Sequence, residues 1–348
     1  MGVDHGPMDN TIEFLGATTY RVRSNGLTLF LDTYIDRPSA TPGPFSVESI
    51  TEADYIFISH AHFDHLPGCD RIALQTGAQV VGSCEVIRLM REAGVPERQL
   101  IPVAGGERIP LFKRATWEAA LKGECKQRDN FPDATREPHH SLAVSAVDVW
   151  PSLHAMIIDH NTPEVWDTAS VTPSVDDRPY ACTLDITRGM RYGLLQLDKL
   201  VPEEKRDARM QSFIDFVKDP KNVFSHCDGG QLMYNFRFFD SGKVMLWNAH
   251  LGGYEGILRD LEPKPDLALL GIPGNANLNG RPFKGSGAEF LKLECEWLGQ
   301  PERVCWCLHD ETPIKPYRVD PTAATRLVEA ETRSRVWELE PAKVYPLF

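Results

Sequence analysis

The sequence predicts an α/β fold built from layers of strands and helices, and three observations lead to this prediction. Alternating segments on each side of Asn25-Gly26 indicate an antiparallel hairpin over residues 18–32, because both turn residues tolerate positive φ. Short apolar runs then alternate with amphipathic stretches over residues 54–94 and again over residues 255–330. The 348 residues, 42% of them hydrophobic, can bury the core of a single domain spanning residues 1–348.

The expected elements follow in order along the chain. In the first half, strands at 54–59 and 78–83 alternate with helices at 69–77 and 83–94, the second helix capped by Ser83 and stopped by Gly94. In the second half, a strand pair turns at residues 240–242, and strands at 266–272 and 303–308 follow. Helices are expected at 254–263, at 286–299 with Ser286 as its cap, and after Asp320-Pro321.

Two polar segments interrupt this alternation, at residues 113–140 and 159–212. Neither has a clear hydrophobic period, and the second contains prolines at 163, 173 and 179. We interpret both as insertions near the active site. A substrate lid and a passive surface loop remain alternative roles for them.

Composition narrows the partners and the location. With 37 Lys and Arg against 49 Asp and Glu, the formal charge is -12, so no nucleic-acid partner is expected. The sequence has no apolar segment long enough to cross a membrane, and no secretory signal is expected. The eight cysteines are too dispersed for a disulfide framework. We therefore expect a cytoplasmic protein that acts on a small molecule, and a homo-oligomer is compatible with the sequence.

The stretch "FISHAHFDHLPGCD", residues 57–70, directly follows an apolar strand and points to a metal site. His60 and His62 are two residues apart in extended backbone, so both project to one side and can chelate one ion. Asp64 and His65 can address a second ion beside the first. Three of the chain's eleven histidines lie in these six positions next to an acid, a density that solvated loop residues seldom reach.

Such a cluster needs further ligands from distant parts of the chain. His154 and His309 each come just beyond an apolar strand and meet this requirement. A purely structural zinc site is the alternative, but structural sites favour thiolates and close all four ligand positions. The mixture of nitrogen and oxygen ligands therefore favours a catalytic site.

The motif His-x-His-x-Asp-His at residues 60–65 resembles that of the metallo-β-lactamase fold hydrolases. Within that superfamily the chain is most similar to the branch of ascorbate-6-phosphate lactonase-like and N-acyl-phosphatidylethanolamine phospholipase D-like proteins. The resemblance implies a four-layer αββα sandwich with inserted loop or lid segments and a site at one edge. It also implies a first ion on His60, His62 and His154, and a second on Asp64, His65 and His309. Asp32 would support these ligands without binding metal.

The sequence departs from this family at the acid that bridges the two ions. The matching stretch "VMLWNAHLGG" offers Asn248, which lacks the negative charge that draws two cations together. Asn248 could bind through its amide oxygen, His250 could replace it, or only one ion could be retained. We expect Asn248 near the metals, with His250 the less favoured ligand.

These features predict a metal-dependent hydrolase that uses metal-bound hydroxide on an ester, lactone, amide or phosphodiester of a small molecule. Asp64 would orient the hydroxide and carry its proton, and Arg281 is a further candidate for substrate contact. One or two divalent ions are expected, zinc before manganese or iron. The alternatives are a mononuclear iron-dependent, dioxygenase-like oxidoreductase and a non-catalytic binding protein with an impaired metal site.

Overall fold

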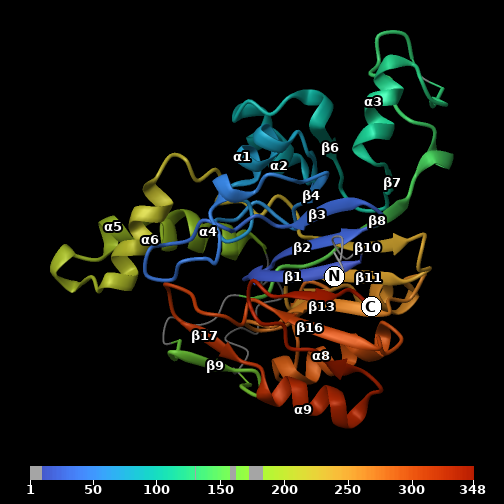
Figure 1. The fold of residues 1–348 in the computed structure, drawn as a ribbon. Coiled ribbons are helices and arrows are strands. Elements are labelled where there is room, and N and C mark those ends of the chain that lie inside the picture. The colour runs from blue at the N-terminus through green and yellow to red at the C-terminus, as the bar shows by residue number, and fades with distance from the viewer. Residues whose placement is uncertain (1–9, 130, 157–161, 172–182) are drawn as a thin grey trace, which may run out of the picture.

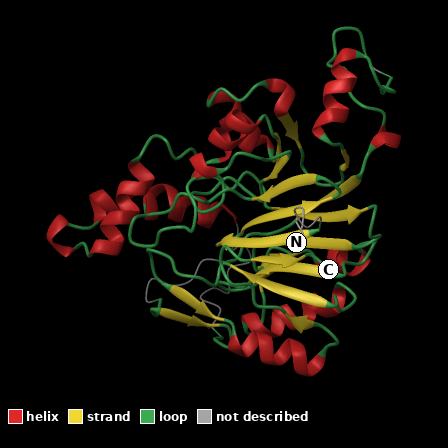
Figure 2. Cartoon of the chain, in the orientation of Figure 1, coloured by secondary structure: helices red, strands yellow, loops and turns green. Residues whose placement is uncertain are grey.

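The computed structural model describes residues 10–129, 131–156, 162–171 and 183–348. Two large sheets face each other in the centre, and helices cover both outer faces (Figures 1 and 2). The second predicted insertion, residues 159–212, lies partly outside the described residues.

The first sheet is formed by the N-terminal strands and closed by a C-terminal strand. Strands β1, β2 and β3 are antiparallel, and β3, β4, β5 and β6 are parallel neighbours. The predicted hairpin around Asn25-Gly26 is confirmed, since Ser24 pairs with Leu27. Within the described chain, the strand order is β19 (Val344–Pro346), β1 (Thr11–Gly16), β2 (Thr19–Ser24), β3 (Leu27–Leu31), β4 (Tyr55–Phe57), β5 (Gln79–Gly82) and β6 (Leu100–Pro102).

The second sheet combines parallel and antiparallel pairs. Strand β11 is antiparallel to β10 and parallel to β13, which is itself parallel to β16. In the described residues the order is β18 (Arg335–Val336), β16 (Arg303–Cys307), β13 (Leu267–Gly271), β11 (Val244–Asn248), β10 (Leu232–Phe238), β8 (Ser145–Pro151) and β7 (Arg108–Leu111).

The helices complete a four-layer αββα sandwich, as the sequence resemblance implied (Figure 1). Helices α1 (Cys69–Thr76) and α2 (Cys84–Glu92) pack on the first sheet, where Ile72 and Val86 share a buried cluster with Ile56. Helices α7 (Glu255–Asp260), α8 (Gly287–Trp297) and α9 (Thr322–Glu331) pack on the second sheet through Leu258, Leu291 and their neighbours.

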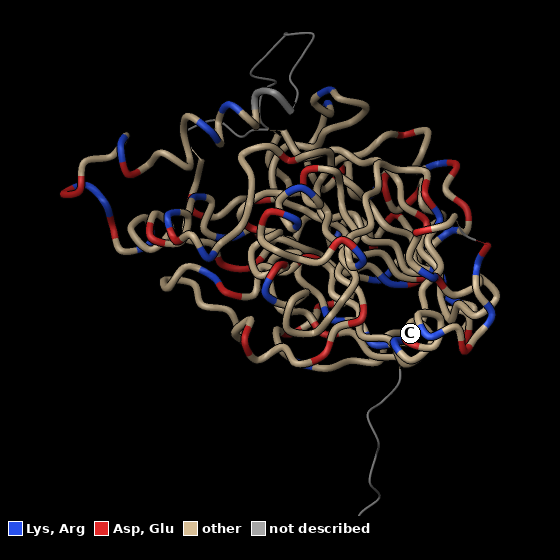
Figure 3. The backbone as a smooth tube through the Cα atoms, turned by 90° about the horizontal axis from the view of Figure 1, so that it is seen from above, with Lys and Arg blue, Asp and Glu red and all other residues tan. Residues whose placement is uncertain are grey.

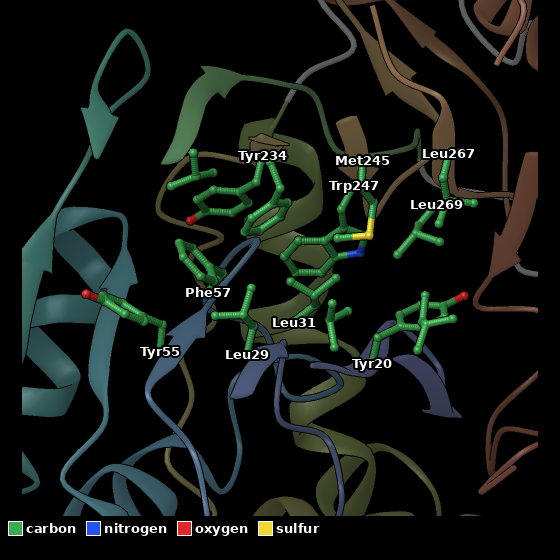
Figure 4. Packing of buried hydrophobic residues seen from close by; sticks show 14 of the residues in the cluster. Tyr20, Leu29, Leu31, Tyr55, Phe57, Tyr234, Met245, Trp247, Leu267 and Leu269 are labelled. Atoms are coloured by element: carbon green, nitrogen blue, oxygen red, sulfur yellow. The ribbon is translucent and has the colours of Figure 1, made fainter. Parts of the chain in front are cut away.

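Aromatic side chains fill the space between the two sheets (Figure 4). The ring of Phe57 meets Tyr234 edge-on at a centroid distance of 5.3 Å and Phe236 at 4.9 Å. Trp247 stacks on Tyr234 at 5.7 Å and is fully buried. Edge-to-face pairs of this kind stabilise a core beyond their area of burial, so they fix how the sheets and their edges are aligned.

Helix ends follow the predicted caps. The Ser83 side chain accepts a hydrogen bond from the backbone N–H of Val86. Ser286 and Glu289 form a reciprocal capping box at the start of α8. Such caps satisfy backbone donors that have no partner inside the helix.

The described parts of both predicted insertions lie outside the two large sheets. The first contains α3 (Arg114–Lys122), a helix that the sequence did not predict because its buried stripe is narrow: Ala120 is its buried residue. The second contains α4 (Thr183–Tyr192), α5 (Leu197–Leu200) and the start of α6 (Ala208–Lys218), and these helices lie together at one side of the sandwich (Figure 1). Strand β9 (Val165–Asp167) pairs with β17 (Arg318–Asp320). The remaining short elements are β12 (Gly252–Gly253), β14 (Asn277–Leu278), β15 (Arg281–Pro282) and 3-10 turns at Val47–Ser49, Glu97–Gln99, His140–Leu142, Leu194–Gln196 and Glu203–Lys205.

Basic and acidic residues of the described chain are mixed along the backbone. Lysines and arginines are interspersed with aspartates and glutamates along the backbone seen from above (Figure 3). Among the described residues, none of the helices combines the length and the apolarity needed to cross a bilayer.

Candidate metal centre

Five histidines meet at one edge of the sandwich, beyond the ends of three strands. His60, His62 and His65 follow β4, His154 follows β8, and His250 follows β11. They form two groups in which one ligand nitrogen from each member lies within 4.8 Å of the others. The groups are His60, His62 and His154, and His60, His65 and His250.

Several ring nitrogens in this cluster are buried without a hydrogen-bond partner in the described structure. They are Nε2 of His62, Nε2 of His65 and both nitrogens of His250. A buried polar atom with no partner costs roughly 1–3 kcal/mol, so this concentration requires an explanation. A bound metal ion supplies one, because imidazole nitrogen is a preferred ligand of zinc and related ions. The residues therefore fit a divalent metal.

The electrostatic environment keeps most of these rings neutral and able to bind a cation. Burial lowers the pKa of His60, His62 and His250 well below the usual range, and the neighbouring imidazoles lower it further. Burial also lowers the pKa of His154 to about 4. Its Nδ1 lies 2.9 Å from the carbonyl oxygen of Ala155 and donates to it, which leaves Nε2 free.

Asp32 lies behind His65, on the side away from the other rings. Its Oδ2 is 2.6 Å from Nδ1 of His65 and also accepts from the hydroxyls of Thr18 and Ser59, while its Oδ1 accepts from the backbone N–H of Ser59. Burial alone would lower the pKa of His65, but Asp64 and Asp32 raise it overall. With Nδ1 held by Asp32, Nε2 of His65 faces the cluster as the ligand atom.

Asp64 is the one acid of the motif that borders both the cluster and solvent. Its Oδ2 is 3.7 Å from Nε2 of His65, and its side chain is 29% exposed. Together with His250 it lines a cavity of about 160 Å³. A carboxylate in this position can contact a ligand that enters the cavity.

The structure brings His250, rather than Asn248, into the cluster. The ring of His250 stacks on His154 at 3.8 Å. The Asn248 side chain is engaged elsewhere: its amide oxygen accepts from Ser152 and its nitrogen donates to Gly252 and Glu294. From the sequence we expected Asn248 near the metals and His250 as the less favoured ligand. The structure places His250 in the cluster and Asn248 outside it.

Asn248 instead belongs to a buried network beneath the ligand loops. Glu294 of α8 is fully buried and accepts from Asn248 Nδ2 at 2.8 Å, and Ser152 lies two residues before His154. Burial raises the pKa of Glu294 to about 8. The network connects the loop that carries His154 to the loop that carries His250.

The raised pKa of Glu294 predicts a pH-dependent stability. The folded protein holds the Glu294 proton up to about pH 8, whereas the unfolded chain releases it near pH 4.3. The free energy of unfolding should therefore fall between these two pH values, by an amount on the order of a few kcal/mol. Glu294→Gln cannot release this proton, so it should lack this decrease in the free energy of unfolding. Denaturant unfolding should therefore show that the variant gains stability relative to wild type between pH 5 and pH 8.5. Glu296→Gln, at a partly exposed position of the same helix, is the matched control, and a gap between Glu294→Gln and wild type that stays constant with pH would contradict the prediction.

His309 does not lie with the cluster, in contrast to the expectation that it binds with Asp64 and His65. Its ring lies parallel to Phe14 at a centroid distance of 5.7 Å and lines a separate cavity of about 300 Å³ with Trp337 and Glu338. Leu308 has a φ of 58°, which turns the chain after β16. As a result Asp310, rather than His309, lines the cavity that contains Asp64 and His250.

Arg281 is also placed away from the histidines. It is exposed in β15 and lines a different hollow with Lys284. Arg37 and Asp310 pair at 2.7 Å beside the cavity. Neither residue was among the site residues predicted from the sequence. The positions of these two residues follow from loops that come together only in the fold, so no local signal marked them.

Comparisons with known proteins agree with the fold. A family model described as the β-lactamase superfamily domain matches residues 28–127. A metal-dependent hydrolase of Pyrobaculum arsenaticum is 36% identical over 100 residues, which are 29% of this chain and 44% of that relative. A metal-dependent hydrolase of Chloroflexus aurantiacus is 28% identical over 112 residues, or 32% of this chain and 46% of that relative. The matches therefore span less than half of these relatives.

Solved structures resemble the chain over almost its whole length. Igni18, a metallo hydrolase of Ignicoccus hospitalis, gives a TM-score of 0.55 at 16% identity and covers 97% of both chains. An isothiocyanate hydrolase from Delia radicum gut bacteria gives 0.50 at 10% identity, covering 96% of this chain and 98% of that one. The diiron β-hydroxylase CmlA of Streptomyces venezuelae gives 0.50 at 13% identity, covering 98% and 55%.

The αββα sandwich and the histidines gathered at its edge define a protein of the metallo-β-lactamase fold. Residues 28–127 match the β-lactamase superfamily domain, and the curated relatives named above are metal-dependent hydrolases.

Proposed function

We propose that this protein is a zinc-dependent hydrolase that cleaves an ester, lactone, amide or phosphodiester bond of a small molecule. The observation that carries the proposal is the set of buried, unpartnered imidazole nitrogens beside Asp64 at the mouth of a cavity. Zinc is favoured over manganese because the ligands are nitrogen-rich, whereas manganese prefers carboxylates and water. When bound, such an ion lowers the pKa of a coordinated water and polarises the bond to be cleaved.

The chain's own residues have distinct roles in this proposal. His60, His62 and His154 hold the first ion, and His65 and His250 with Asp64 hold a second, weaker position. The weakness follows from charge, since neutral His250 does not offset the repulsion between two cations as a bridging carboxylate would. The Asp64 carboxylate orients the attacking water and accepts its proton. Zinc titration of the metal-free protein should accordingly show one tight and one weaker step.

Asp64→Asn tests the catalytic part of the proposal. The amide keeps the size of the side chain but cannot accept the proton, so kcat/KM should fall roughly 10²- to 10⁴-fold. Zinc bound by His60, His62 and His154 should remain, because Asp64 is outside that group. The measurement is hydrolysis of a panel of nitrophenyl esters, lactones, amides and phosphodiesters by zinc-loaded protein, with bound zinc determined in the same samples.

Two outcomes would refute this proposal. Fully zinc-loaded wild type that cleaves nothing in the panel would favour a binding protein. Iron as the metal in protein purified without added metal, together with oxygen consumption, would favour an oxidoreductase.

We also propose a cytoplasmic location, because the seven cysteines of the described chain are free thiols, which a reducing compartment maintains.

A further inference from the structure

The cavity beside Asp64 and His250 has a wall made largely of apolar side chains. Phe63, Leu308, Pro313, Ile314 and Val319 contribute to this wall. Phe63 lies between two residues of the metal motif, so the apolar surface begins directly at the cluster. Any molecule whose reacting bond reaches the cluster from this side must place its adjoining group against these side chains.

The wall is held in place by helix α6, which begins within the second insertion and continues past its end. Helix α6 contributes Phe213, whose ring meets Phe63 edge-on at 5.1 Å, and Phe216, which meets Tyr34 at 5.6 Å. Opposite, Thr312 bonds to the carbonyl oxygens of Ile314 and Pro316 and fixes the loop after β16. The cavity is therefore pre-formed by packed side chains, as small-molecule sites usually are.

The charged groups at the cavity are largely matched within the protein. Arg37 pairs with Asp310 at 2.7 Å, and its side chain is only 6% exposed. Glu311 pairs with Arg209 at 3.0 Å, and Lys315 lies 3.7 Å from Glu164. Arg318 is exposed rather than part of the buried wall. A carboxylate placed against the apolar wall would lose its hydration, and Nη2 of Arg37, which is buried without a hydrogen-bond partner, belongs to a guanidinium whose charge Asp310 already offsets.

The volume of the cavity also limits which substrate group fits beside the cluster. The cavity has a volume of about 160 Å³. An apolar protein cavity of about 150 Å³ holds a molecule the size of benzene. This space suits one ring or a short branched chain beside the cluster.

We propose that the group next to the scissile bond of the substrate is uncharged, apolar and about the size of one phenyl ring. This inference rests on the proposed function, because the metal-bearing cluster defines where the scissile bond lies. It assigns the apolar wall around Ile314 as the determinant of specificity.

Hydroxamates test the inference without a known substrate, because the hydroxamate binds zinc and its substituent probes the cavity. On zinc-loaded protein, benzohydroxamate should bind more tightly than acetohydroxamate by roughly 10-fold or more, the order that even one methylene contributes in an apolar pocket. Adding a carboxylate at the 4-position should remove this gain. Equal affinities for the first two probes, or tightest binding of the carboxylate, would overturn the inference.

Variants locate the effect on the proposed wall. Ile314→Asp should bring the affinity ratio of benzohydroxamate to acetohydroxamate close to one while acetohydroxamate binding stays unchanged. Ile314→Trp, which fills the cavity without adding charge, should do the same and guards against misfolding of the first variant. Leu121→Asp is the matched control, since Leu121 is 47% exposed on α3. An unchanged ratio in both Ile314 variants would contradict the assignment.

A metal-independent measurement separates this inference from the proposed function. Fluorobenzene binding, followed by ¹⁹F NMR on the protein as purified, should be present in wild type and lost in Ile314→Trp. If no hydroxamate binds zinc-loaded protein but fluorobenzene does, the hydrolase proposal fails while the apolar site stands. If fluorobenzene does not bind, the inference fails whatever the metal content.

Discussion

Replacing His60 with alanine is expected to abolish high-affinity metal binding. His60 is one of the three ligands proposed for the first and tighter ion, so its loss reduces that set to His62 and His154. Removing a residue that only supports a ligand already costs roughly 10- to 100-fold in metal affinity, so losing a ligand itself should cost more. Zinc titration of the metal-free protein with a competing chelator measures this, and activity should fall in proportion.

Alanine variants of His250, His309 and Asn248 provide the comparison for this prediction. His250→Ala should weaken the second zinc step and leave the first, whereas His309→Ala should leave both unchanged because His309 stacks on Phe14 in another cavity. Asn248→Ala should affect metal only indirectly, through the network with Glu294. Loss of zinc in His309→Ala with retention in His250→Ala would show that the ligand set is the one the sequence resemblance implied.

Much of the fold could be predicted from local sequence. The Asn25-Gly26 turn fixed the first hairpin, and the apolar runs marked β4, β5, β13 and β16 because buried strands have this pattern. The capping residues Ser83 and Ser286 marked the helix starts. The dense motif at residues 60–65 likewise indicated where the histidine cluster begins, since its members are close in sequence.

The distant ligands were harder to predict because side-chain direction beyond a strand depends on backbone detail. Trp247 faces the core between the sheets, so the next residue, Asn248, must face the helical layer and Glu294. His250, two residues further along, then turns towards the cluster. After β16, the positive φ of Leu308 similarly redirects His309 to Phe14. A pattern of residue types carries no information about such a turn.

The cavity depends on contacts that no local pattern reveals. Its wall combines Phe63 from the motif loop, Ile314 from the loop after β16 and support from α6. The sequence marked residues 159–212 only as an insertion near the site. The contact between Phe213 and Phe63 comes from the part of α6 that lies just beyond this segment.

Asp32→Ala is expected to destabilise the protein and to weaken the metal site at the same time. The carboxylate is fully buried and accepts from Thr18, from the backbone and hydroxyl of Ser59, and from His65. Each buried donor left without a partner costs roughly 1–3 kcal/mol, so the free energy of unfolding should fall by about 3 kcal/mol or more. Asp32 also has a φ of 50°, a conformation that alanine adopts less readily than aspartate.

The effect on metal follows from the hydrogen bond to His65. Without Asp32, Nδ1 of His65 has no carboxylate to fix the ring, so zinc affinity at the second position should fall roughly 10- to 100-fold. Asp54→Ala is the matched control, because Asp54 also accepts a backbone N–H next to a strand, from Thr28, but has no contact with the histidines. Asp54→Ala should lower the free energy of unfolding with no change in zinc affinity. If Asp32→Ala behaves like this control, Asp32 supports only the fold, whereas a combined loss shows that the same carboxylate stabilises the sheet edge and orients a ligand.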